Sequence, residues 1–278
     1  MSSTSGTSMI TSSSSELPAV PAGQQARIAL DGVSLRFRKY GEKRATLKQT
    51  VINAIFRRTY QTVGDFWLFK DLDLAVEHGQ RLGIIGPNAA GKSTLLKLIC
   101  GIFQPTAGRI SVRGRLAPLI ELGAGFNHEL SGIENIYLNG ALLGFGPSQM
   151  GAKIERILDF AGLSDFAQTP IKYYSTGMLL RLAFSVATDI EPEILLVDEI
   201  FAGGDAQFVA KATERMNKLM DSSHIVILVS HDLRLIQRMC NRVIWLDHGR
   251  IAMDGTARDV CRSYWKSTLP EGHPKRGA

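Results

Sequence analysis

The stretch GPNAAGKS at residues 86–93 decides the fold, because it matches the spacing G-x-x-x-x-G-K-[ST] of a phosphate-binding loop. It follows an apolar strand pattern at residues 81–85 and precedes a helix pattern from Ser93 to about Cys100. Glycines let backbone N–H groups turn towards a phosphate, and the helix start adds unpaired amides and a positive dipole end. The alternative, a glycine-rich turn that binds nothing, is disfavoured by the strictness of the motif.

Within this loop each polar side chain has an expected role. We expect Lys92 to reach the β- and γ-phosphates of a nucleotide and the Ser93 hydroxyl to bind Mg²⁺. The residues expected to contact the nucleotide are Gly86, Asn88, Ala89, Gly91, Lys92, Ser93 and Thr94. The loop therefore predicts a bound nucleoside triphosphate together with Mg²⁺.

The composition of the 278 residues fits a folded α/β protein and excludes several other classes. With 45% hydrophobic residues the chain can bury a core, and it has no apolar run of about 18 residues that would cross a bilayer. Three cysteines, Cys100, Cys240 and Cys261, lack metal-ligand spacing and disfavour a zinc site or a disulfide framework. The net charge of +6 is compatible with nucleic acid, an anionic membrane face or solubility alone.

Strand and helix patterns alternate on both sides of the loop. The strand patterns lie at residues 28–37, 72–76, 81–85, 108–122 around Gly114, 194–197, 225–229 and 243–246. From about residue 132 to 188 the periodicity is helical, which indicates an inserted helical lobe. This order predicts an α/β fold whose parallel or mixed sheet is covered on both faces.

Composition also marks the ends of the folded part. Residues 1–26 begin with a run rich in Ser, Thr, Gly and Ala and lack the basic and apolar regions of a signal peptide, so we expect a disordered tail. A second tail, with Pro, Gly and Lys, is expected at 267–278. One folded domain at 27–266 remains.

A basic insertion interrupts this domain at about residues 38–66. Eight basic residues and one acid lie between Arg36 and Arg58, and Leu47, Val51 and Ile55 recur at helical spacing. The segment is either a solvated helix face or a cationic surface for anionic lipid or a membrane protein.

Two acids end a buried strand further along the chain. Asp198 and Glu199 follow the apolar run 194–197, and the carboxyl ends of strands are where α/β sheets place ligand chemistry. We expect Asp198 to hold Mg²⁺, and Glu199 to polarise the water that attacks the γ-phosphate. Together with the phosphate loop, the pair predicts a nucleotide hydrolase.

Two further motifs complete a family resemblance. The sequence YSTGM at 174–178 precedes a helical run with Ser175 as a plausible N-cap, and LVSHD at 228–232 follows the next strand pattern. With the phosphate loop and Asp198-Glu199, these motifs make residues 27–266 resemble the ATP-binding-cassette (ABC) ATPases. The resemblance implies a P-loop NTPase (RecA-like) core with an antiparallel β subdomain and an inserted α-helical subdomain at about 130–190.

The resemblance also implies that two chains enclose two ATP molecules. YSTGM occupies the place of the family signature LSGGQ, which contacts the γ-phosphate of ATP held by the other subunit. Ser175 and Gly177 match that signature, whereas Thr176 and Met178 depart from it. His231 matches the switch histidine that contacts the γ-phosphate. Asp205 matches the loop that communicates across the dimer, and it is also a candidate helix N-cap.

Finer features are similar to one branch of the family. The segment ELGAGFNHELSGIENI at 121–136 and the YSTGM signature look like the ATPases that power bacterial export of capsule, O-antigen or teichoic acid. Most ABC ATPases carry a Mg²⁺-sensing glutamine between the phosphate loop and the signature, but here Gln104 is too early and Gln149 too late. Glu121 is the nearest polar side chain and is our candidate third metal-site residue.

Two other positions depart from the family or remain open. Where the family usually has glycine the chain has Ala89, which we expect to keep a negative φ. For the aromatic ring that stacks on adenine we favour Phe37, with Tyr40, Tyr60 and Trp67 as competitors, and with packing in the core as the alternative role of Phe37.

The resemblance therefore implies an ATPase subunit, with ATP and Mg²⁺ as cofactors, that powers polysaccharide export. We expect a homodimer that binds peripherally to the cytoplasmic face of the membrane, works with a separate integral-membrane permease, and does not bind nucleic acid. The alternatives are export of teichoic acid or another lipid-linked glycan, a non-transport ABC ATPase that acts on nucleic acid or ribosomes, and a module that binds ATP with little hydrolysis.

Overall fold

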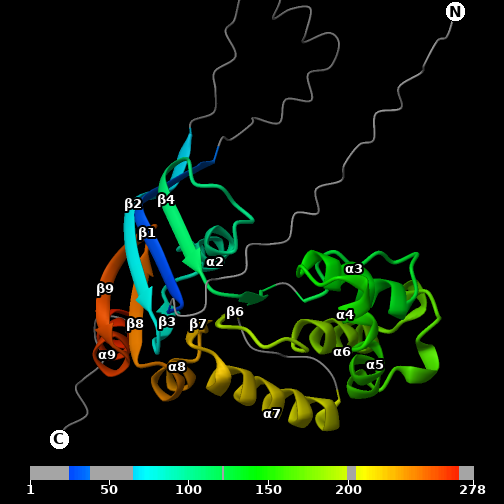
Figure 1. The fold of residues 1–278 in the computed structure, drawn as a ribbon. Helices are drawn as coiled ribbons and strands as arrows, with labels where there is room; N and C mark the ends of the chain where they lie inside the picture. The colour runs from blue at the N-terminus through cyan, green and yellow to red at the C-terminus, as the bar shows by residue number, and fades with distance from the viewer. Residues whose placement is uncertain (1–24, 38–64, 121, 199–204, 269–278) are drawn as a thin grey trace, which may run out of the picture.

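The computed structural model describes residues 25–37, 65–120, 122–198 and 205–268. Most of the basic insertion, both tails, Glu121 and Glu199 lie outside these residues. Figure 1 shows the arrangement of the helices and strands. The strands are β1 (Arg27–Phe37), β2 (Phe66–Glu77), β3 (Arg81–Ile85), β4 (Ala107–Arg113), β5 (Leu116–Leu119), β6 (Ile194–Asp198), β7 (Ile225–Val229), β8 (Arg242–Asp247) and β9 (Arg250–Thr256).

The helices fall into two groups in the chain. Those of the helical lobe are α3 (Gly132–Leu142), α4 (Pro147–Gly151), α5 (Ile154–Ala161) and α6 (Thr176–Ala187), with short 3₁₀ turns η1 (Ser164–Phe166) and η2 (Ile171–Tyr173). The others are α2 (Lys92–Ile99), α7 (Ala206–Ser222), α8 (Leu233–Met239) and α9 (Ala257–Thr268).

The strands form two sheets. The smaller one is antiparallel with the order β2-β1-β4, and the larger one has the order β5-β6-β7-β3-β8-β9. Within the larger sheet β9 alone runs antiparallel to its neighbour, while the other pairs are parallel. Strands β6 and β7 are almost continuously apolar because a parallel strand between two helical layers is buried on both faces. The α/β fold with a mixed sheet agrees with the sequence prediction.

Three apolar clusters fill the layers. The first joins the two sheets around α2, and it includes Phe69 of β2 and Leu95 of α2. The second lies on the other face of the larger sheet, under α7, α8 and α9. The third is the core of the helical lobe, which Figure 1 shows to the side of the sheets. The lobe therefore has its own core and meets the sheet domain through α6 and the connection to β6.

The helical lobe begins at a capping box that the sequence motif contains. Ser131 Oγ accepts a hydrogen bond from the backbone N–H of Glu134 at 3.3 Å, and the Glu134 carboxylate accepts the N–H of Ser131 at 2.7 Å. These bonds satisfy amides at the start of α3. The N–H and the hydroxyl of Ser131 both donate to the Glu134 carboxylate and hold the pKa of Glu134 below its usual value. The helical lobe thus begins at α3, whose start is fixed by the capping box of Ser131 and Glu134.

Three elements, β2, β9 and α9, extend beyond the sequence patterns. Strand β2 begins at Phe66 rather than at Leu72, because a bulge at Asp71 breaks the alternation of buried residues; its backbone has a φ of 49° and its N–H donates to Ser34 Oγ at 3.0 Å. At the other end the chain forms β9 and α9, which the sequence patterns did not predict, and α9 continues past residue 266.

No helix in the described residues combines the length and the apolar character needed to cross a membrane.

Candidate functional site

The phosphate loop joins the end of β3 to α2, at the carboxyl edge of the larger sheet. Gly86 has a φ of 148°, and a side chain there would collide with the backbone carbonyl of Leu246 in the neighbouring strand β8. Gly91, the N-cap of α2, has a φ of 104°, and a Cβ would lie 2.8 Å from the ring of Phe69. Both positions therefore require glycine for conformation and for space.

Ala89 does not have the conformation expected from its side chain. The prediction of a negative φ is wrong, because Ala89 has a φ of 62°. The turn of the loop between Gly86 and Gly91 determines the backbone here and overrides the preference of alanine. A left-handed non-glycine residue costs about 1–2 kcal/mol, so the loop holds this residue under strain.

Lys92 and its neighbours surround a pocket of about 650 Å³. The Lys92 ammonium donates hydrogen bonds to the backbone carbonyls of Gly86 and Pro87, each at 2.9 Å, and the residue is buried. The described lining residues are Leu68, Asn88, Ala89, Gly91, Lys92, Ser93, Thr94, Ile120, Asp198, Val229 and His231. The structure therefore brings most of the residues predicted from three separate motifs into one pocket.

Oxygen donors in this pocket suit a magnesium ion. Ser93 lies in the first turn of α2, and Asp198 ends β6, whose register places Asp198 beside Val229 of β7. A hydroxyl and a carboxylate are hard ligands of the kind that Mg²⁺ takes together with phosphate oxygens. Both residues thus fit the predicted metal role, whereas Glu199 and Glu121 lie outside the described residues; Ile120, next to Glu121, lines the pocket.

His231 enters the pocket from the loop after β7. Ser230 before it accepts the N–H of Asp232 at 3.1 Å, and Asp232 caps α8 by accepting the N–H groups of Arg234 and Leu235. These bonds fix the backbone on the C-terminal side of His231. The histidine is therefore presented to the pocket by a strand end and a capped helix.

Phe37 is not among the residues that line this pocket. Its ring lies edge-on to Phe103 with centroids 5.9 Å apart, and it ends β1 partly exposed. The guanidinium of Arg36 lies over Trp67, at 5.4 Å from its centroid. Leu68, the next residue of β2, does line the pocket and was missed by the sequence analysis, which considered only aromatic residues for this wall.

The signature residues lie apart from the phosphate loop in a single chain. Ser175 is the N-cap of α6 and accepts the N–H of Met178 at 3.2 Å, as the sequence predicts. Neither Ser175 nor Gly177 is among the residues that line the pocket. The tip of α6 therefore does not contribute to the described lining of this chain's own nucleotide pocket.

Asp205 is also a helix cap, which is the second of the two roles predicted for it. Its carboxylate accepts the N–H of Phe208 at 2.9 Å at the start of α7, and this bond holds the pKa of Asp205 below its usual value. Arg181 of the signature helix lies 3.6 Å from the same carboxylate. Asp205 thus connects the start of α7 to the middle of α6, the helix that follows the signature.

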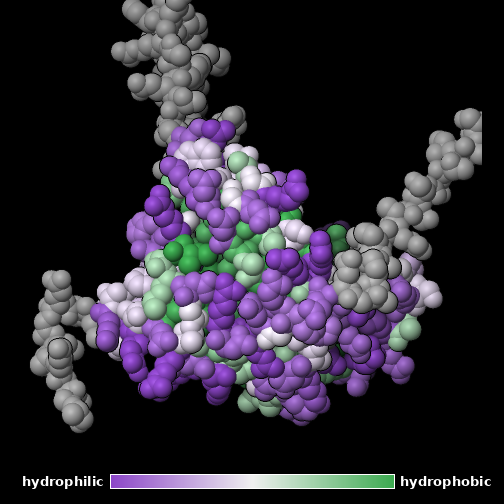
Figure 2. All heavy atoms as spheres, turned by 60° about the vertical axis from the view of Figure 1, so that its left-hand side comes forward, coloured by the Kyte–Doolittle hydropathy of each residue, from purple (hydrophilic) through white to green (hydrophobic). Residues whose placement is uncertain are grey.

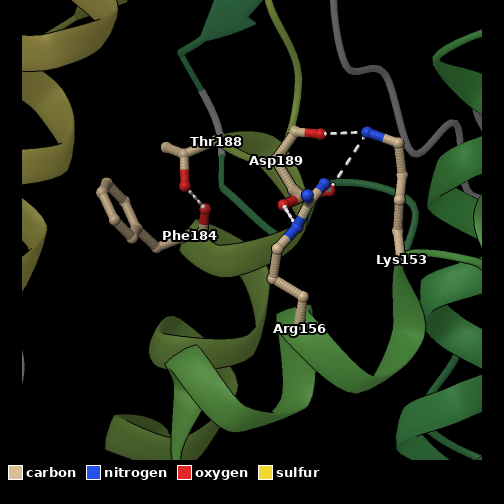
Figure 3. A network of polar contacts seen from close by, with 5 residues as sticks. All are labelled: Lys153, Arg156, Phe184, Thr188 and Asp189. Carbon is tan, nitrogen blue, oxygen red and sulfur yellow. Dashed lines mark hydrogen bonds and ion pairs between the residues drawn. The ribbon is translucent and has the colours of Figure 1, made fainter.

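An ion cluster around a buried carboxylate lies at the far end of the signature helix, α6 (Figure 3). Arg156 of α5 donates two hydrogen bonds of 2.7 Å to the carboxylate of Asp189, just after α6, and Lys153 lies 3.1 Å from it. The side chain of Asp189 is only 5% exposed, and its carboxylate raises the pKa of Arg156. We call these three residues the Asp189 clamp; it ties α5 to the connection between α6 and β6.

Aromatic rings join the same helices to α7. Phe160 of α5 lies against Phe184 of α6 and Phe208 of α7, with centroids 6.1 and 5.8 Å away. The guanidinium of Arg215, also on α7, stacks over Phe160 at 3.5 Å. The sequence analysis missed this cluster, for which only the helical periodicity of each segment gave a signal.

Comparison with known proteins places these motifs in a family. The family described as "ABC transporter" matches residues 69–202. The ABC transporter protein AbcA of Aeromonas salmonicida is 43% identical over 207 residues, which is 74% of this chain and 67% of AbcA. The O-antigen export system ATP-binding protein RfbB of Klebsiella pneumoniae is 40% identical over 70% of this chain and 79% of its own length.

A third relative and two solved structures add to this picture. The teichoic acids export ATP-binding protein TagH of Listeria monocytogenes is 31% identical over 91% of this chain and 76% of TagH. An ATP-binding subunit of an ABC transporter superposes with a TM-score of 0.62 at 23% identity, over 87% of this chain and 95% of that one. A dimeric ATP-binding cassette bound to ADP and Pi gives 0.61 at 20% identity, over 83% and 99%. The two structures confirm the predicted fold class.

Proposed function

The chain belongs to the ABC transporter family, and from this we propose that it is the ATP-hydrolysing subunit of an ABC transporter that exports a cell-surface polysaccharide of capsular or O-antigen type. The names of its relatives support this substrate class, because two of them are O-antigen and teichoic acid export proteins. The non-transport ABC ATPase has no such support among these relatives.

One observation carries the ATPase part of the proposal. Lys92, Ser93, Asp198 and His231 come from three separate strand ends, yet all line one pocket of about 650 Å³. They supply a cation, a hydroxyl, a carboxylate and an imidazole at the carboxyl edge of a parallel sheet, which is where α/β proteins bind ligands. Packing of the sheet edge alone does not account for four polar side chains in one pocket, whereas binding of a nucleotide and Mg²⁺ does.

The pocket residues would perform phosphoryl transfer to water by positioning and charge. The amides of the loop and Lys92 would hold the β- and γ-phosphates. To reach them, the Lys92 ammonium would give up its hydrogen bonds to the carbonyls of Gly86 and Pro87. Ser93 and Asp198 would hold Mg²⁺, which neutralises charge on the phosphates. Glu199 would orient the attacking water and accept its proton, and His231 would donate a hydrogen bond to the γ-phosphate.

A second copy of the chain would complete the site. Ser175 caps α6 with its side chain, and the first amides of that helix remain directed outward from the tip. These amides would receive the γ-phosphate of an ATP bound to the loop of the partner, giving two equivalent sites in a homodimer. The dimeric cassette with ADP and Pi shares the fold, which supports this arrangement.

The proposal includes a membrane partner. Dimer closure on ATP would be transmitted to a separate integral-membrane permease, and the chain would work at the cytoplasmic face of the membrane without binding nucleic acid. The export-system names of the relatives support this assembly. RNA-stimulated ATP turnover by the purified protein would instead favour the non-transport ATPase.

Export of teichoic acid or another lipid-linked glycan is the second candidate. It is favoured by the TagH relative, whose similarity extends over 91% of this chain. The two candidates share the ATPase mechanism and differ in the polymer carried.

A single strain comparison tests the function and separates these candidates. Cells that lack this protein should accumulate the polymer inside, and the chemical composition of that polymer identifies the substrate. Complementation with the unaltered chain should restore export, and complementation with Lys92→Ala should not. Normal surface polymer in the deletion strain would contradict the export function.

A further inference from the structure

A second cavity, of about 880 Å³, lies beside the nucleotide pocket between α8 and α9. Its walls are the end of β3, the loop after β7, one face of α8 and one face of α9. His231 lines both cavities, whereas Lys92, Ser93 and Asp198 line the nucleotide pocket. Gly86 of the phosphate loop also lines this second cavity. The volume falls in the range of small-molecule sites, and the proposed ATPase mechanism assigns no role to the residues of α8 and α9 that form its other walls.

The wall formed by α9 offers an aromatic surface. Cys261, Trp265 and Thr268 recur at spacings of four and three residues, so they share the helix face that lines the cavity. The ring of Tyr264 is already packed edge-on against Trp245, with centroids 5.3 Å apart. Trp265 is 59% exposed, which leaves its indole as the aromatic surface that a ligand in the cavity would meet.

The cavity is positively charged. Arg234 of α8 and Arg262 of α9 both line it and are exposed, and none of the ion pairs found between described residues includes either guanidinium. Among the described lining residues the one acid is Asp232, which accepts the backbone N–H groups of Arg234 and Leu235 as the cap of α8. Two guanidinium groups that line one cavity from different helices are suited to bind a phosphate by paired hydrogen bonds.

Uncharged polar groups complete the lining. Ser230, Gln237 and Thr268 supply two hydroxyls and an amide, which both donate and accept hydrogen bonds. A single aromatic wall surrounded by such groups suits a sugar ring, whose C–H face packs on indole while its hydroxyls bond around the rim. A purine base would instead favour apolar contact on both of its faces.

We propose that this cavity binds a phosphorylated sugar, with the sugar ring on Trp265 and the phosphate between Arg234 and Arg262. A free sugar phosphate and the glycosyl phosphate of a lipid-linked glycan share this chemistry. The site adjoins the nucleotide pocket and shares His231 with it, but the residues proposed to bind the ligand lie outside that pocket and do not depend on the proposed ATPase activity.

Calorimetric titration of the purified full-length chain with glucose 1-phosphate tests the site, in the presence of saturating Mg-ADP so that the phosphate loop is filled. Saturable binding is expected, and Arg262→Gln and Trp265→Ala should each weaken it about tenfold or more, as for loss of a charged hydrogen bond or a stacking surface. The matched control is Arg258→Gln, also exposed on α9 but outside the lining, which should bind as the unaltered chain does.

Four results would overturn the proposal. They are equal affinity in Arg262→Gln and the unaltered chain, equal affinity for glucose or for inorganic phosphate alone, tighter binding of AMP, and loss of binding in Lys92→Ala. The last would place the ligand in the phosphate loop. Because the titration measures no ATP turnover, and Lys92→Ala can be titrated without nucleotide, failure of the ATPase proposal would leave this test intact.

A second experiment, with vesicles, distinguishes a free sugar phosphate from the glycosyl phosphate of a lipid-linked glycan. Sedimentation with vesicles that contain polyprenyl phosphoglucose, compared with vesicles that lack it, should retain the unaltered chain and not Arg262→Gln if the glycosyl phosphate is lipid-linked. Saturable binding of glucose 1-phosphate without such retention supports the free sugar phosphate.

Discussion

The phosphate loop and the signature helix tip are the two halves of the proposed composite site, and they are held in place differently. The loop is fixed within a few residues, by the backbone conformations of Gly86 and Gly91 and by the bonds of Lys92 to its own loop. The tip at Ser175 depends on distant contacts, namely the Asp189 clamp at the other end of α6 and the rings that join α5, α6 and α7.

The two halves should therefore respond differently to substitution. A change in the loop should remove nucleotide binding while the fold persists. A change in the clamp should lower stability and misplace the tip while the loop still binds nucleotide. Substitutions in each half should therefore separate nucleotide binding from stability.

Lys92→Ala should remove the cation that the proposal places on the phosphates. We expect ATP turnover to fall at least about 100-fold, as for loss of one preorganised charge-stabilising group, with thermal unfolding little changed. A phosphate-release assay with a thermal melt measures both. Turnover within a few-fold of the unaltered chain would show that the loop is not the catalytic half.

Asp189→Asn should damage the other half. Replacing the buried carboxylate leaves the Lys153 and Arg156 charges without their partner, and we expect the free energy of unfolding to fall by about 1–3 kcal/mol. Binding of Mg-ADP to the folded chain should be unchanged. Chemical denaturation and calorimetry measure these two quantities.

Asp254→Asn is the matched control for the clamp. Asp254 also accepts two hydrogen bonds from an arginine, Arg242, at 2.9 and 2.6 Å, but its side chain is 36% exposed. We expect a cost below about 1 kcal/mol, because solvent reaches this carboxylate and screens it, whereas the Asp189 carboxylate is buried. Equal costs at Asp189 and Asp254 would remove the special role assigned to the buried carboxylate of the Asp189 clamp.

Ser175→Ala removes the cap at the tip itself. The N–H of Met178 loses its acceptor, and the loss of an N-cap lowers stability by about 1 kcal/mol. Ser175→Asp keeps a capping oxygen and should recover that stability, whereas its negative charge should oppose a γ-phosphate in the partner's site. In denaturation Ser175→Asp should therefore be more stable than Ser175→Ala, whereas in ATP-dependent dimerisation it should be the weaker of the two. Equal dimerisation of the two variants would contradict the assignment of Ser175 to the γ-phosphate.

Ala89→Gly should change the free energy of unfolding least, and it should raise it rather than lower it. Glycine relieves the strain of the left-handed φ of 62° but adds freedom to the unfolded chain. We expect a gain in unfolding free energy of up to about 1 kcal/mol. A loss of stability in the denaturation midpoint would show that the loop relaxes around alanine without strain.

The same contrast explains what the sequence predicts well. Strands β3, β6 and β7 are recognisable because each is a short apolar run, and the phosphate loop because its spacing is strict. Ser175 and Asp205 were both predicted as helix caps, since a cap is a local signal, and both accept the expected N–H groups.

Other features could not be predicted because their causes are not local. The φ of Ala89 follows from the path of the whole loop, and the early start of β2 is hidden by the bulge at Asp71. The clamp joins Arg156 to Asp189 across more than thirty residues, and no pattern in either segment names the other. Long-range pairing of charged side chains therefore marks the limit of prediction from this sequence.

The proposed composite site is tested most directly by the oligomeric state of Glu199→Gln protein in Mg-ATP. If the loop of one copy and the Ser175 tip of the other enclose the same ATP, blocking hydrolysis should trap a dimer in analytical ultracentrifugation, and adding Lys92→Ala should return it to a monomer. A Glu199→Gln chain that stays monomeric while saturated with Mg-ATP would contradict the account.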